Sequence, residues 1–488
     1  MYNNIMHKKT KILATLGPAS DSLESIQKLI KTGVNVFRLN FSHGTHTYHS
    51  EVLARIRQAI INTQKIVGVL QDISGPKVRI GELESDFSLK CGDIVEFTQE
   101  TIVGKQLTPT HYILSINQVT ILKQLKLDDY IYMYDGIIRS KVIHVDAKSI
   151  QVEIQNDGIL SSKKGVNFPN TELGIDIITP KDKKDMFWGV QNNVDFMAIS
   201  FVQNADDMIQ ARDIIKQYGG ETKLIAKIEK FDAVKNIDGI LQASDGLMVA
   251  RGDLGIEIPY YDVPNVQKML IKKANSAAKP VITATQMLLS MTKNDTATRA
   301  EISDIANAVL DGTDAVMLSE ESAVGHNPAL AVETMVKTIE GIEQKYPFFQ
   351  YKYITCNDRA DNINEAAVRL SDTLKADGLL CITSSGESAK KIARYKPYCP
   401  VFAVTHSLKT AQHLTLSWGI EPTFNVNDES LGMMMSDLME QGLQSGILNL
   451  QAQYILTAGD PVGVSGSTNM IRIISANEME FFRGLRWK

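Results

Sequence analysis

Eight short apolar runs, separated by segments with helical periodicity, constrain the fold of this chain more than any other feature. Each run has the length and the apolar content of a buried parallel strand. The runs occupy residues 10–16, 34–40, 66–72, 194–201, 223–228, 246–251, 281–285 and 315–319. Eight strands that alternate with helices favour a closed (β/α)8 TIM barrel, although the count alone leaves an open doubly wound sheet as an alternative.

A long insert interrupts this alternation between the third and the fourth run. Its sequence is rich in β-type alternation, and the pairs Gly92-Asp93, Asp135-Gly136 and Asp157-Gly158 mark turns between the alternating segments. We therefore predict a small antiparallel β-barrel lid domain over residues 76–172, inserted after the third strand of a barrel formed by residues 1–75 and 173–345.

After Tyr346 the strand–helix alternation resumes with new units. Helical patterns at residues 363–376, 388–396 and 429–446 alternate with strand-like runs such as "GLLCIT", "PVFAVTH" and "YILTAGD", and "NMIRIISA" supplies a closing strand. We expect a separate C-terminal α/β domain over residues 346–488, with the methionines at 433–435 filling its core.

Composition excludes several classes of protein. The formal net charge of −5 gives no basic field that would attract nucleic acid. No apolar stretch reaches the roughly 18 residues of a membrane span, and the first residues contain no apolar signal region. The four cysteines form no CxxC pair, which fits a reducing compartment. We therefore expect a cytoplasmic protein with neither nucleic-acid nor membrane partners.

Charged and polar residues end many of the predicted barrel strands. They are Arg38, Asn40, Ser42, Asp72, Lys227, Glu229, Arg251, Asp253, Thr285, Ser319, Glu320 and Glu321. A single charge at a strand end is usually only solvated, but the active site of a TIM barrel lies at the carboxyl ends of its strands. So many cations and carboxylates at one end therefore favour an active site.

The fifth and sixth strands carry the most specific pattern. Lys227 and Glu229 are two residues apart, so the strand period places them on one face. A lysine that faces a barrel interior requires an anionic partner. Glu229 and Asp253 are hard oxygen ligands that suit Mg²⁺, and Arg38 has the fork geometry that binds phosphate. A phosphate, a divalent ion and a fixed lysine are the components of phosphoryl transfer.

Five segments resemble the pyruvate kinase family. They are "VFRLNFSHG", "IAKIEKF", "GLMVARGDLGIEIP", "ITATQMLLSM" and "TRAEISDIANAVLDGTDAVMLSEESA". The resemblance covers essentially the whole chain, including the insert and the C-terminal domain. It implies a glycolytic, Mg²⁺-dependent enzyme, with Mn²⁺ as a possible substitute, that converts phosphoenolpyruvate and ADP to pyruvate and ATP as a homotetramer.

The resemblance also implies roles for individual residues. Arg38 and Lys227 would hold the transferring phosphoryl group, and Glu229 and Asp253 would ligate Mg²⁺. The backbone at Gly252 and Asp253, together with Thr285, would receive the substrate carboxylate. Thr285 would relay a proton from water to the enolate, with Ser319 and Glu321 behind it. The nucleotide would contact Asn40, His43, Arg79 and the lid residue Lys164, with Asp135 near the same cleft.

One motif departs from the pattern of K⁺-dependent family members. In those enzymes, the K⁺ ligands match Asn40, Ser42, Asp72 and the residue after it, which is a threonine. Here that residue is Ile73, and Lys77 stands where the family pattern has glutamate. An ammonium group near Asp72 can supply the charge of the missing ion. We expect an enzyme that does not require K⁺; the alternative is that Lys77 points to solvent at the domain hinge.

The C-terminal domain contains a hydroxyl-rich segment between a strand and a helix. Its residues are Thr383, Ser384, Ser385, Gly386 and Ser388. The pattern fits an anion site as well as ordinary helix capping. Because the family often binds a phosphorylated effector at this loop, we expect allosteric activation. Glu387, and the absence of Lys or Arg in the loop at 459–467, favour a monophosphate over a bisphosphate sugar.

Two other functions compete with a kinase. A Mg²⁺-dependent 2-oxo-acid lyase or aldolase would share Glu229 and Asp253 but would have no use for Lys164 on a lid. A catalytically inactive metabolite sensor would need only the C-terminal loop, and the intact set of Arg38, Lys227, Glu229 and Asp253 argues against it.

Overall fold

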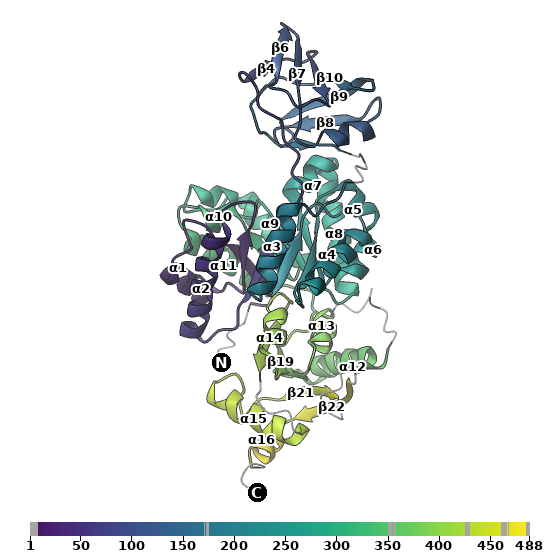
Figure 1. Cartoon of the computed structure of the whole chain (residues 1–488). Helices are drawn as coiled ribbons and strands as arrows, with labels where there is room; N and C mark the ends of the chain where they lie inside the picture. Colours follow the sequence, from purple (N-terminus) through teal and green to yellow (C-terminus); the bar gives the residue numbers. More distant parts are fainter. Residues whose placement is uncertain are drawn as a thin grey trace.

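The computed structural model describes residues 8–169, 171, 175–349, 354, 358–424, 430–459, 466 and 468–484. These residues form three bodies in a row: a small β domain, a central barrel and a C-terminal α/β domain (Figure 1). No helix within the described ranges is long and apolar enough to cross a membrane.

Eight parallel strands close the central barrel, which confirms the predicted TIM barrel. The strands are β1 (Lys11–Thr15), β2 (Val36–Asn40), β3 (Gly68–Asp72), β13 (Phe196–Ile199), β14 (Lys223–Ile228), β15 (Gly246–Ala250), β16 (Val281–Ala284) and β17 (Ala315–Leu318). They pair in the order β1-β17-β16-β15-β14-β13-β3-β2, and β2 closes the ring on β1. The register places Asn40 beside Asp72, so the carboxyl ends of neighbouring strands meet at one end of the barrel.

Helices and short 3-10 turns follow the barrel strands. They are α1 (Leu23–Thr32), α2 (His46–Thr63), α3 (Pro180–Gln191), α4 (Ala205–Gln217), α5 (Phe231–Lys235), α6 (Ile237–Ala243), α7 (Arg251–Glu257), η2 (Tyr260–Asp262), α8 (Val263–Ser276), η3 (Leu289–Thr292), α9 (Arg299–Leu310), α10 (Glu320–Ala323) and α11 (Pro328–Glu343). Reciprocal capping boxes start three of them: Thr179 with Asp182 at α3, Asn204 with Asp207 at α4, and Thr298 with Glu301 at α9.

The sixth strand differs in detail from the sequence prediction. The predicted run at 246–251 included Arg251, but β15 ends at Ala250 and the short helix α7 begins at Arg251. Gly252 and Asp253 therefore lie in the first turn of a helix rather than at a strand end. Backbone N–H groups in a first helical turn have no partner within the helix, so they are free to bind other groups.

The inserted domain lies between β3 and α3 and caps the carboxyl end of the barrel (Figure 1). Its strands are β4 (Phe87–Leu89), β5 (Ile94–Thr98), β6 (Lys105–Thr108), β7 (His111–Leu114), β8 (Tyr130–Met133), β9 (Ile138–Val145), β10 (Ser149–Ile154), β11 (Gly158–Leu160) and β12 (Val166–Asn167), with the 3-10 turn η1 (Val119–Gln124). The main sheet has the order β12-β8-β9-β10-β5-β7-β6. Its pairings are antiparallel except for the parallel pair β5 and β7, so the sheet is mixed.

The C-terminal domain is built on a five-stranded sheet of order β20-β19-β18-β21-β22. Its strands are β18 (Gly378–Ile382), β19 (Val401–Thr405), β20 (Ile420–Phe424), β21 (Tyr454–Gly459) and β22 (Thr468–Ile474), and its helices are α12 (Arg359–Leu374), α13 (Glu387–Ala393), α14 (Leu408–Leu414), α15 (Leu431–Gln444) and α16 (Ala476–Arg483). Met434 and Met435 are buried in its core, as predicted, whereas Met433 is only partly buried.

Candidate active site

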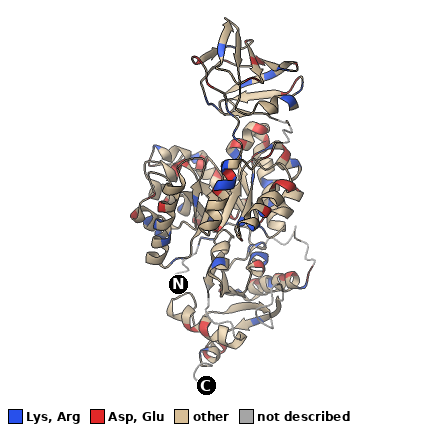
Figure 2. Ribbon diagram, in the orientation of Figure 1, with Lys and Arg blue, Asp and Glu red and all other residues tan. Residues whose placement is uncertain are grey.

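The end of the barrel that faces the inserted domain holds a cluster of charged side chains. Figure 2 shows Lys and Arg together with Asp and Glu in this region of the ribbon. At its centre lies Asp72, the last residue of β3 and 2% exposed. Arg38 donates from Nε to Asp72 Oδ2 at 2.7 Å, and Lys227 Nζ lies 3.4 Å from Oδ1. Each oxygen of this carboxylate therefore faces one cation.

Lys227 is fixed by three partners at the carboxyl ends of β3, β13 and its own strand β14. Its Nζ donates to Ser200 Oγ at 2.7 Å and lies 3.3 Å from Glu229 Oε2, besides its contact with Asp72. The ion pair with Glu229 confirms that the two residues share a face. Burial lowers the pKa of Lys227, but the carboxylates of Asp72, Glu229 and Asp253 outweigh it and raise the pKa. The lysine is thus a permanent and positioned cation.

Glu229 and Asp253 form a pair of carboxylates that suits a divalent cation. The backbone N–H of Phe201 donates to Glu229 Oε1 at 2.7 Å, which fixes the side chain. Burial and the charge of Asp253 raise the pKa of Glu229 to about 7, against the opposing effect of Lys227. Two carboxylates that repel each other in a buried place are stabilised by a hard cation, and Mg²⁺ prefers this donor set. The residues therefore fit Mg²⁺.

Thr285 adopts a backbone conformation that is rare for a β-branched residue. Its φ is +69°, and the next residue, Gln286, has φ +56°. The Gly252 N–H donates to Thr285 Oγ1 at 2.9 Å, and Arg251 donates to the Thr285 carbonyl at 2.7 Å. Asp304 holds the Arg251 guanidinium at 2.7 Å. Residues kept in such strained conformations cluster at functional sites, where the surrounding contacts impose the geometry.

Glu321 fastens the loops beside Thr285. It is 1% exposed, and its two oxygens accept hydrogen bonds from the backbone N–H groups of Ser319 at 2.7 Å and Leu288 at 3.0 Å. This carboxylate therefore joins the segment after β16 to the segment after β17. Its observed role is to hold the backbone of Ser319 in place.

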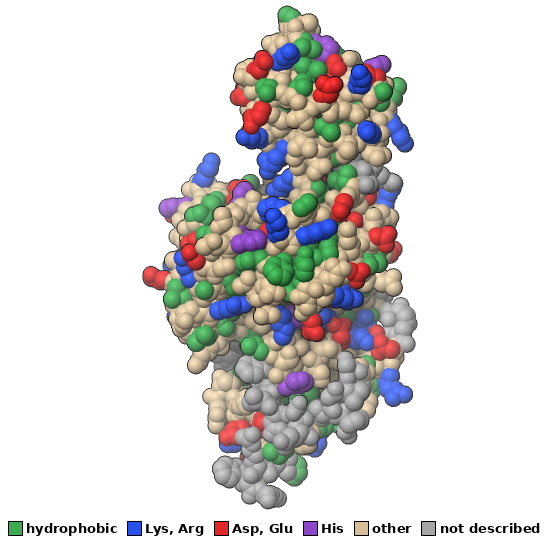
Figure 3. All heavy atoms as spheres, in the orientation of Figure 1, with side chains coloured by type: hydrophobic (Ala, Val, Ile, Leu, Met, Phe, Trp, Pro, Cys, Tyr) green, Lys and Arg blue, Asp and Glu red, His purple; other side chains and the backbone are tan. Residues whose placement is uncertain are grey.

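The lid contributes cations to the opposite side of the cleft. Lys164 Nζ lies 4.1 Å from the centre of the Tyr134 ring, and the Tyr134 N–H donates to the Gly165 carbonyl at 2.8 Å. Arg79 donates to the Lys163 carbonyl at 2.9 Å. Figure 3 shows that the surface is hollowed between the lid and the barrel and that Lys, Arg and His side chains gather there.

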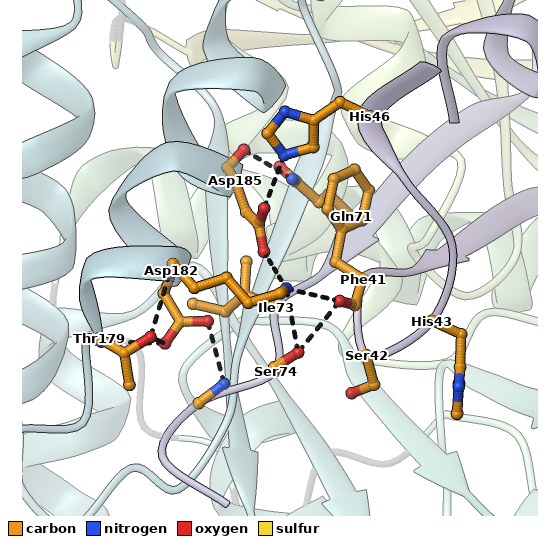
Figure 4. A network of polar contacts seen from close by, with 12 residues as sticks. Phe41, Ser42, His43, His46, Gln71, Ile73, Ser74, Thr179, Asp182 and Asp185 are labelled. Atoms are coloured by element: carbon orange, nitrogen blue, oxygen red, sulfur yellow. Dashed lines mark hydrogen bonds and ion pairs between the residues drawn. The ribbon is translucent and has the colours of Figure 1, made fainter. Parts of the chain in front are cut away.

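A second network ties the two connections of the lid together (Figure 4). Lys181, in the first turn of α3, donates to the Phe41 carbonyl at 2.8 Å and to Asp185 Oδ2 at 2.6 Å. The other oxygen of Asp185 lies 2.7 Å from His46 Nε2. The Gly75 N–H, on the outgoing connection, donates to Asp182 Oδ1 at 3.1 Å.

The predicted nucleotide residues at the end of β2 lie next to this network. The Ser42 N–H donates to Asn40 Oδ1 at 3.1 Å, which closes a tight turn. His43 is exposed, and Figure 4 shows the side chains of Ser42 and His43 outside the dashed contacts. Both side chains are therefore available to a ligand in the cleft.

Ile73 and Lys77 lie where the sequence placed the departure from the family pattern. Ile73 is 1% exposed and belongs to an apolar core cluster with Met197 and Ile199. Among the described residues Lys77 forms no ion pair, with Asp72 or any other carboxylate. Burial and repulsion from Lys227 and Arg79 lower the pKa of Lys77, while Asp253 and Glu229 act in the opposite direction. Its charge therefore acts on the mouth of the site rather than in direct contact with Asp72.

The hydroxyl-rich C-terminal segment is compact. Gly386 has φ +85°, a conformation that favours glycine, and its N–H donates to Thr383 Oγ1 at 3.0 Å. Ser388 and Thr468 share a 2.6 Å hydrogen bond, and Thr410 donates to the Ser384 carbonyl at 3.0 Å. Most of the loop at 459–467, where a second anion contact would lie, is outside the described residues.

Several residues of the site were not singled out by sequence reasoning. Ser200 and Phe201 follow β13 and fix Lys227 and Glu229, and Lys181 links the ends of β2 and β3 to α3. Ser200 and Phe201 closed a predicted strand run, so the rule that strand ends carry function could have found them. Lys181 lies in a helical first turn among several charged residues, and no signal distinguishes it from a solvated lysine.

Comparisons with known proteins agree over nearly the whole chain. The model of the pyruvate kinase barrel domain matches residues 7–332, and the model of the pyruvate kinase alpha/beta domain matches residues 361–474. The pyruvate kinase of Geobacillus stearothermophilus is 39% identical over 480 residues, which cover 96% of this chain and 80% of that protein. Pyruvate kinase 2 of Synechocystis is 38% identical over 478 residues, covering 97% and 80%. The crystal structure of a pyruvate kinase from Cryptosporidium parvum has a TM-score of 0.91, 32% identity and 96% coverage of both chains.

Proposed function

The chain belongs to the pyruvate kinase family, and we propose that it is a member that needs Mg²⁺ but no K⁺ and that responds to a phosphorylated effector. As a pyruvate kinase it is a phosphotransferase that moves the phosphoryl group of phosphoenolpyruvate to ADP, giving pyruvate and ATP. The observation that carries the proposed mechanism is the fixed Lys227 between Asp72 and Glu229.

The first step requires positive charge around the transferring phosphoryl group. Lys227 and Arg38 are the cations at the barrel mouth that Asp72 holds in place, so we assign them to the phosphoryl oxygens. Glu229 and Asp253 would hold Mg²⁺, or Mn²⁺ in its place, and the bound ion would neutralise charge on the phosphate. Because these groups are fixed before substrate binds, little reorganisation is needed during transfer.

The second step places a proton on the enolate that remains after transfer. We assign the first turn of α7, at Gly252 and Asp253, to the substrate carboxylate, which would replace Thr285 Oγ1 as the acceptor of the Gly252 N–H. Gly252 N–H bonds to Thr285 Oγ1, so the Thr285 hydroxyl lies at the same subsite. We assign Thr285 to the relay of a proton from water, with Ser319 held nearby by Glu321.

The nucleotide fits the hollow between lid and barrel. Lys164 and Arg79 on the lid side, and Asn40 and His43 at the end of β2, are the groups that we assign to ADP. The carboxylate of Asp135 lies close to the backbone of Gly165, the residue after Lys164. Asp135 is therefore near Lys164 on the lid. A 2-oxo-acid lyase would have no need for these lid cations, and strict dependence of pyruvate formation on ADP separates the two activities.

The surroundings of Asp72 support the proposed independence of K⁺. Arg38 and Lys227 already engage both of its oxygens, Ile73 adds an apolar side chain instead of a hydroxyl ligand, and Asn40 and Ser42 close on each other. Lys77 supplies a further positive charge at the same mouth. We expect equal turnover in tetramethylammonium buffer with and without KCl at constant ionic strength. A many-fold rise on adding KCl would contradict the proposal.

By analogy with the family, we expect the protein to be a homotetramer.

We assign the hydroxyl-rich segment of the C-terminal domain to the binding of an effector that carries one phosphate group. The test substitutes Ser385→Asp and Ser388→Asp together, which adds negative charge beside Thr383, Ser384 and Gly386. Activation by a sugar phosphate or a nucleoside monophosphate should disappear, with little change in the Michaelis constant without effector. If no such metabolite changes the kinetics of the unaltered enzyme, the segment serves only as a helix cap.

A further inference from the structure

A buried ion pair lies directly behind the two carboxylates assigned to the metal. Lys230, the residue after Glu229, lies 2.8 Å from Oε1 of Glu257, and both side chains are buried. Glu257 ends α7, the helix whose first turn carries Asp253. The pair therefore joins the segment after β14 to the segment after β15, just beyond the residue of each that we assign to Mg²⁺.

The lid contacts the same carboxylate. Asn167, in the last strand of the lid, donates from Nδ2 to Glu257 Oε1 at 3.2 Å. Lys230 and Asn167 also line a common cavity of about 20 Å³ with Pro76 and Val78 of the outgoing lid connection. The returning connection thus contacts the ion pair, and the outgoing connection lines a cavity beside Lys230.

The hydrogen bonding of the pair is poor for a purely stabilising element. Glu257 Oε2 is buried and has no hydrogen-bond partner among the described residues. A buried ion pair offsets its desolvation cost only when the remaining lone pairs are satisfied, and apolar residues of similar volume often stabilise a fold as well or better. Stabilisation alone is therefore a weak reason for two buried charges at this place.

We propose that Lys230 and Glu257 are a positioning pair that couples the position of the lid, sensed through Asn167, to the relative placement of Glu229 and Asp253. The coupling rests on the roles proposed above for these two carboxylates. With the lid in the observed position, Glu257 Oε1 receives two donors, one from the barrel and one from the lid. A lid that rotates away removes the Asn167 donor and leaves the carboxylate to Lys230 alone. The pair then shifts, and the adjoining metal ligands shift with it.

The decisive variant is Asn167→Ala, because it removes the lid contact and leaves the ion pair intact. Lys230→Met removes the pair itself, and Lys230→Arg restores a cation. Lys273→Met is the matched control, since Lys273 forms an exposed ion pair with Asp238 on an outer helix of the same barrel. Hydrogen–deuterium exchange of the lid connections is measured without substrate, and kcat and both Michaelis constants are measured with Mg²⁺.

We expect faster exchange at Pro76–Val78 and Val166–Phe168 in Asn167→Ala and Lys230→Met, but not in Lys273→Met. We also expect kcat to fall by about 10- to 100-fold, the usual effect of losing a group that orients metal ligands. The Michaelis constant for ADP should change much less, and Lys230→Arg should recover part of kcat.

Unchanged exchange and unchanged kcat in Asn167→Ala would overturn the proposal. The ion pair would then be a structural element only. This conclusion would hold even if Lys230→Met failed to fold. The exchange measurement needs neither metal nor substrate. The exchange measurement therefore tests the coupling without relying on the assigned metal ligands. If the assignment of Glu229 to the metal were wrong, Glu229→Gln would keep its Mg²⁺-dependent turnover.

Discussion

The ammonium of Lys227 lies 3.4 Å from Oδ1 of Asp72, on a carboxylate whose other oxygen is bound by Arg38. Burial opposes the ionisation of Asp72, but the two cations outweigh it and lower its pKa. Asp72 is therefore the anion that keeps two cations side by side in a buried place. Without Asp72, the side chains of Arg38 and Lys227 would repel each other and move apart. The positive charge would then no longer be concentrated where the phosphoryl group binds.

Substituting Lys227→Met should lower the turnover of phosphoryl transfer by about 10²- to 10³-fold or more, because a fixed charge is lost from the transition state. The exchange of pyruvate methyl protons with solvent should persist, since that proton need not come from Lys227. Lys223→Met is the matched control on the same strand, at the opposite end of the barrel, and should retain turnover. Near-normal phosphoryl transfer in folded Lys227→Met would refute the assignment.

Thr285→Gly should lose activity without losing stability. The left-handed φ of Thr285 costs about 1 to 3 kcal/mol in a non-glycine residue, and glycine removes this strain. That gain offsets the loss of the hydrogen bond from Gly252. Thr283→Gly, two residues earlier in the buried strand, should lower the melting temperature, because there glycine adds backbone freedom and removes the buried hydrogen bond from Thr283 to Thr313 without relieving any strain. A clear fall in the melting temperature of Thr285→Gly would show that the observed backbone is not strained.

The barrel and its site were largely predictable because they depend on periodicity and on strand ends. Eight apolar runs placed the eight strands, and the alternation within β14 placed Lys227 and Glu229 on one face. Charged residues at strand ends then had to converge, because parallel strands end at the same edge.

Contacts between distant segments were not predictable, for a physical reason. Lys230 follows a strand, and its sequence environment resembles that of a solvated lysine; only the packing of α7 brings Glu257 within 2.8 Å of it. The positive φ of Thr285 is equally hidden, since the contacts from Arg251 and Gly252 impose it and Thr has no local preference for that conformation.

Stability should fall below pH 6.5 through His413. This residue of α14 lies 5.9 Å from the Phe196 ring at the junction of barrel and C-terminal domain. Burial, followed by repulsion from Lys409 and Lys223, lowers its pKa to about 3 from an ordinary 6.5. The unfolded chain therefore binds a proton between these values and the folded chain does not.

The free energy of unfolding should consequently drop by up to about 1.4 kcal/mol for each pH unit as the pH falls from 6.5 toward 4. Above pH 6.5, His413 is neutral in both the folded and the unfolded chain, so this loss of stability is absent. Thermal unfolding of His413→Gln should show a weaker acid dependence than the unaltered protein, whereas the exposed control His406→Gln should show the same dependence. Parallel pH profiles for His413→Gln and the unaltered protein would contradict the prediction.

Lys77→Glu should make turnover depend on added K⁺. The substitution replaces a cation that acts on Glu229 and Asp253 with a third carboxylate, so activity in K⁺-free buffer should fall by about 10²-fold or more. Added KCl should restore part of it, because a free monovalent cation can then balance the new charge. The recovery should be incomplete while Ile73 offers no hydroxyl, and Lys77→Glu combined with Ile73→Thr should recover more. Turnover of Lys77→Glu that stays normal in tetramethylammonium buffer would mean that Lys77 is only a solvated residue of the hinge.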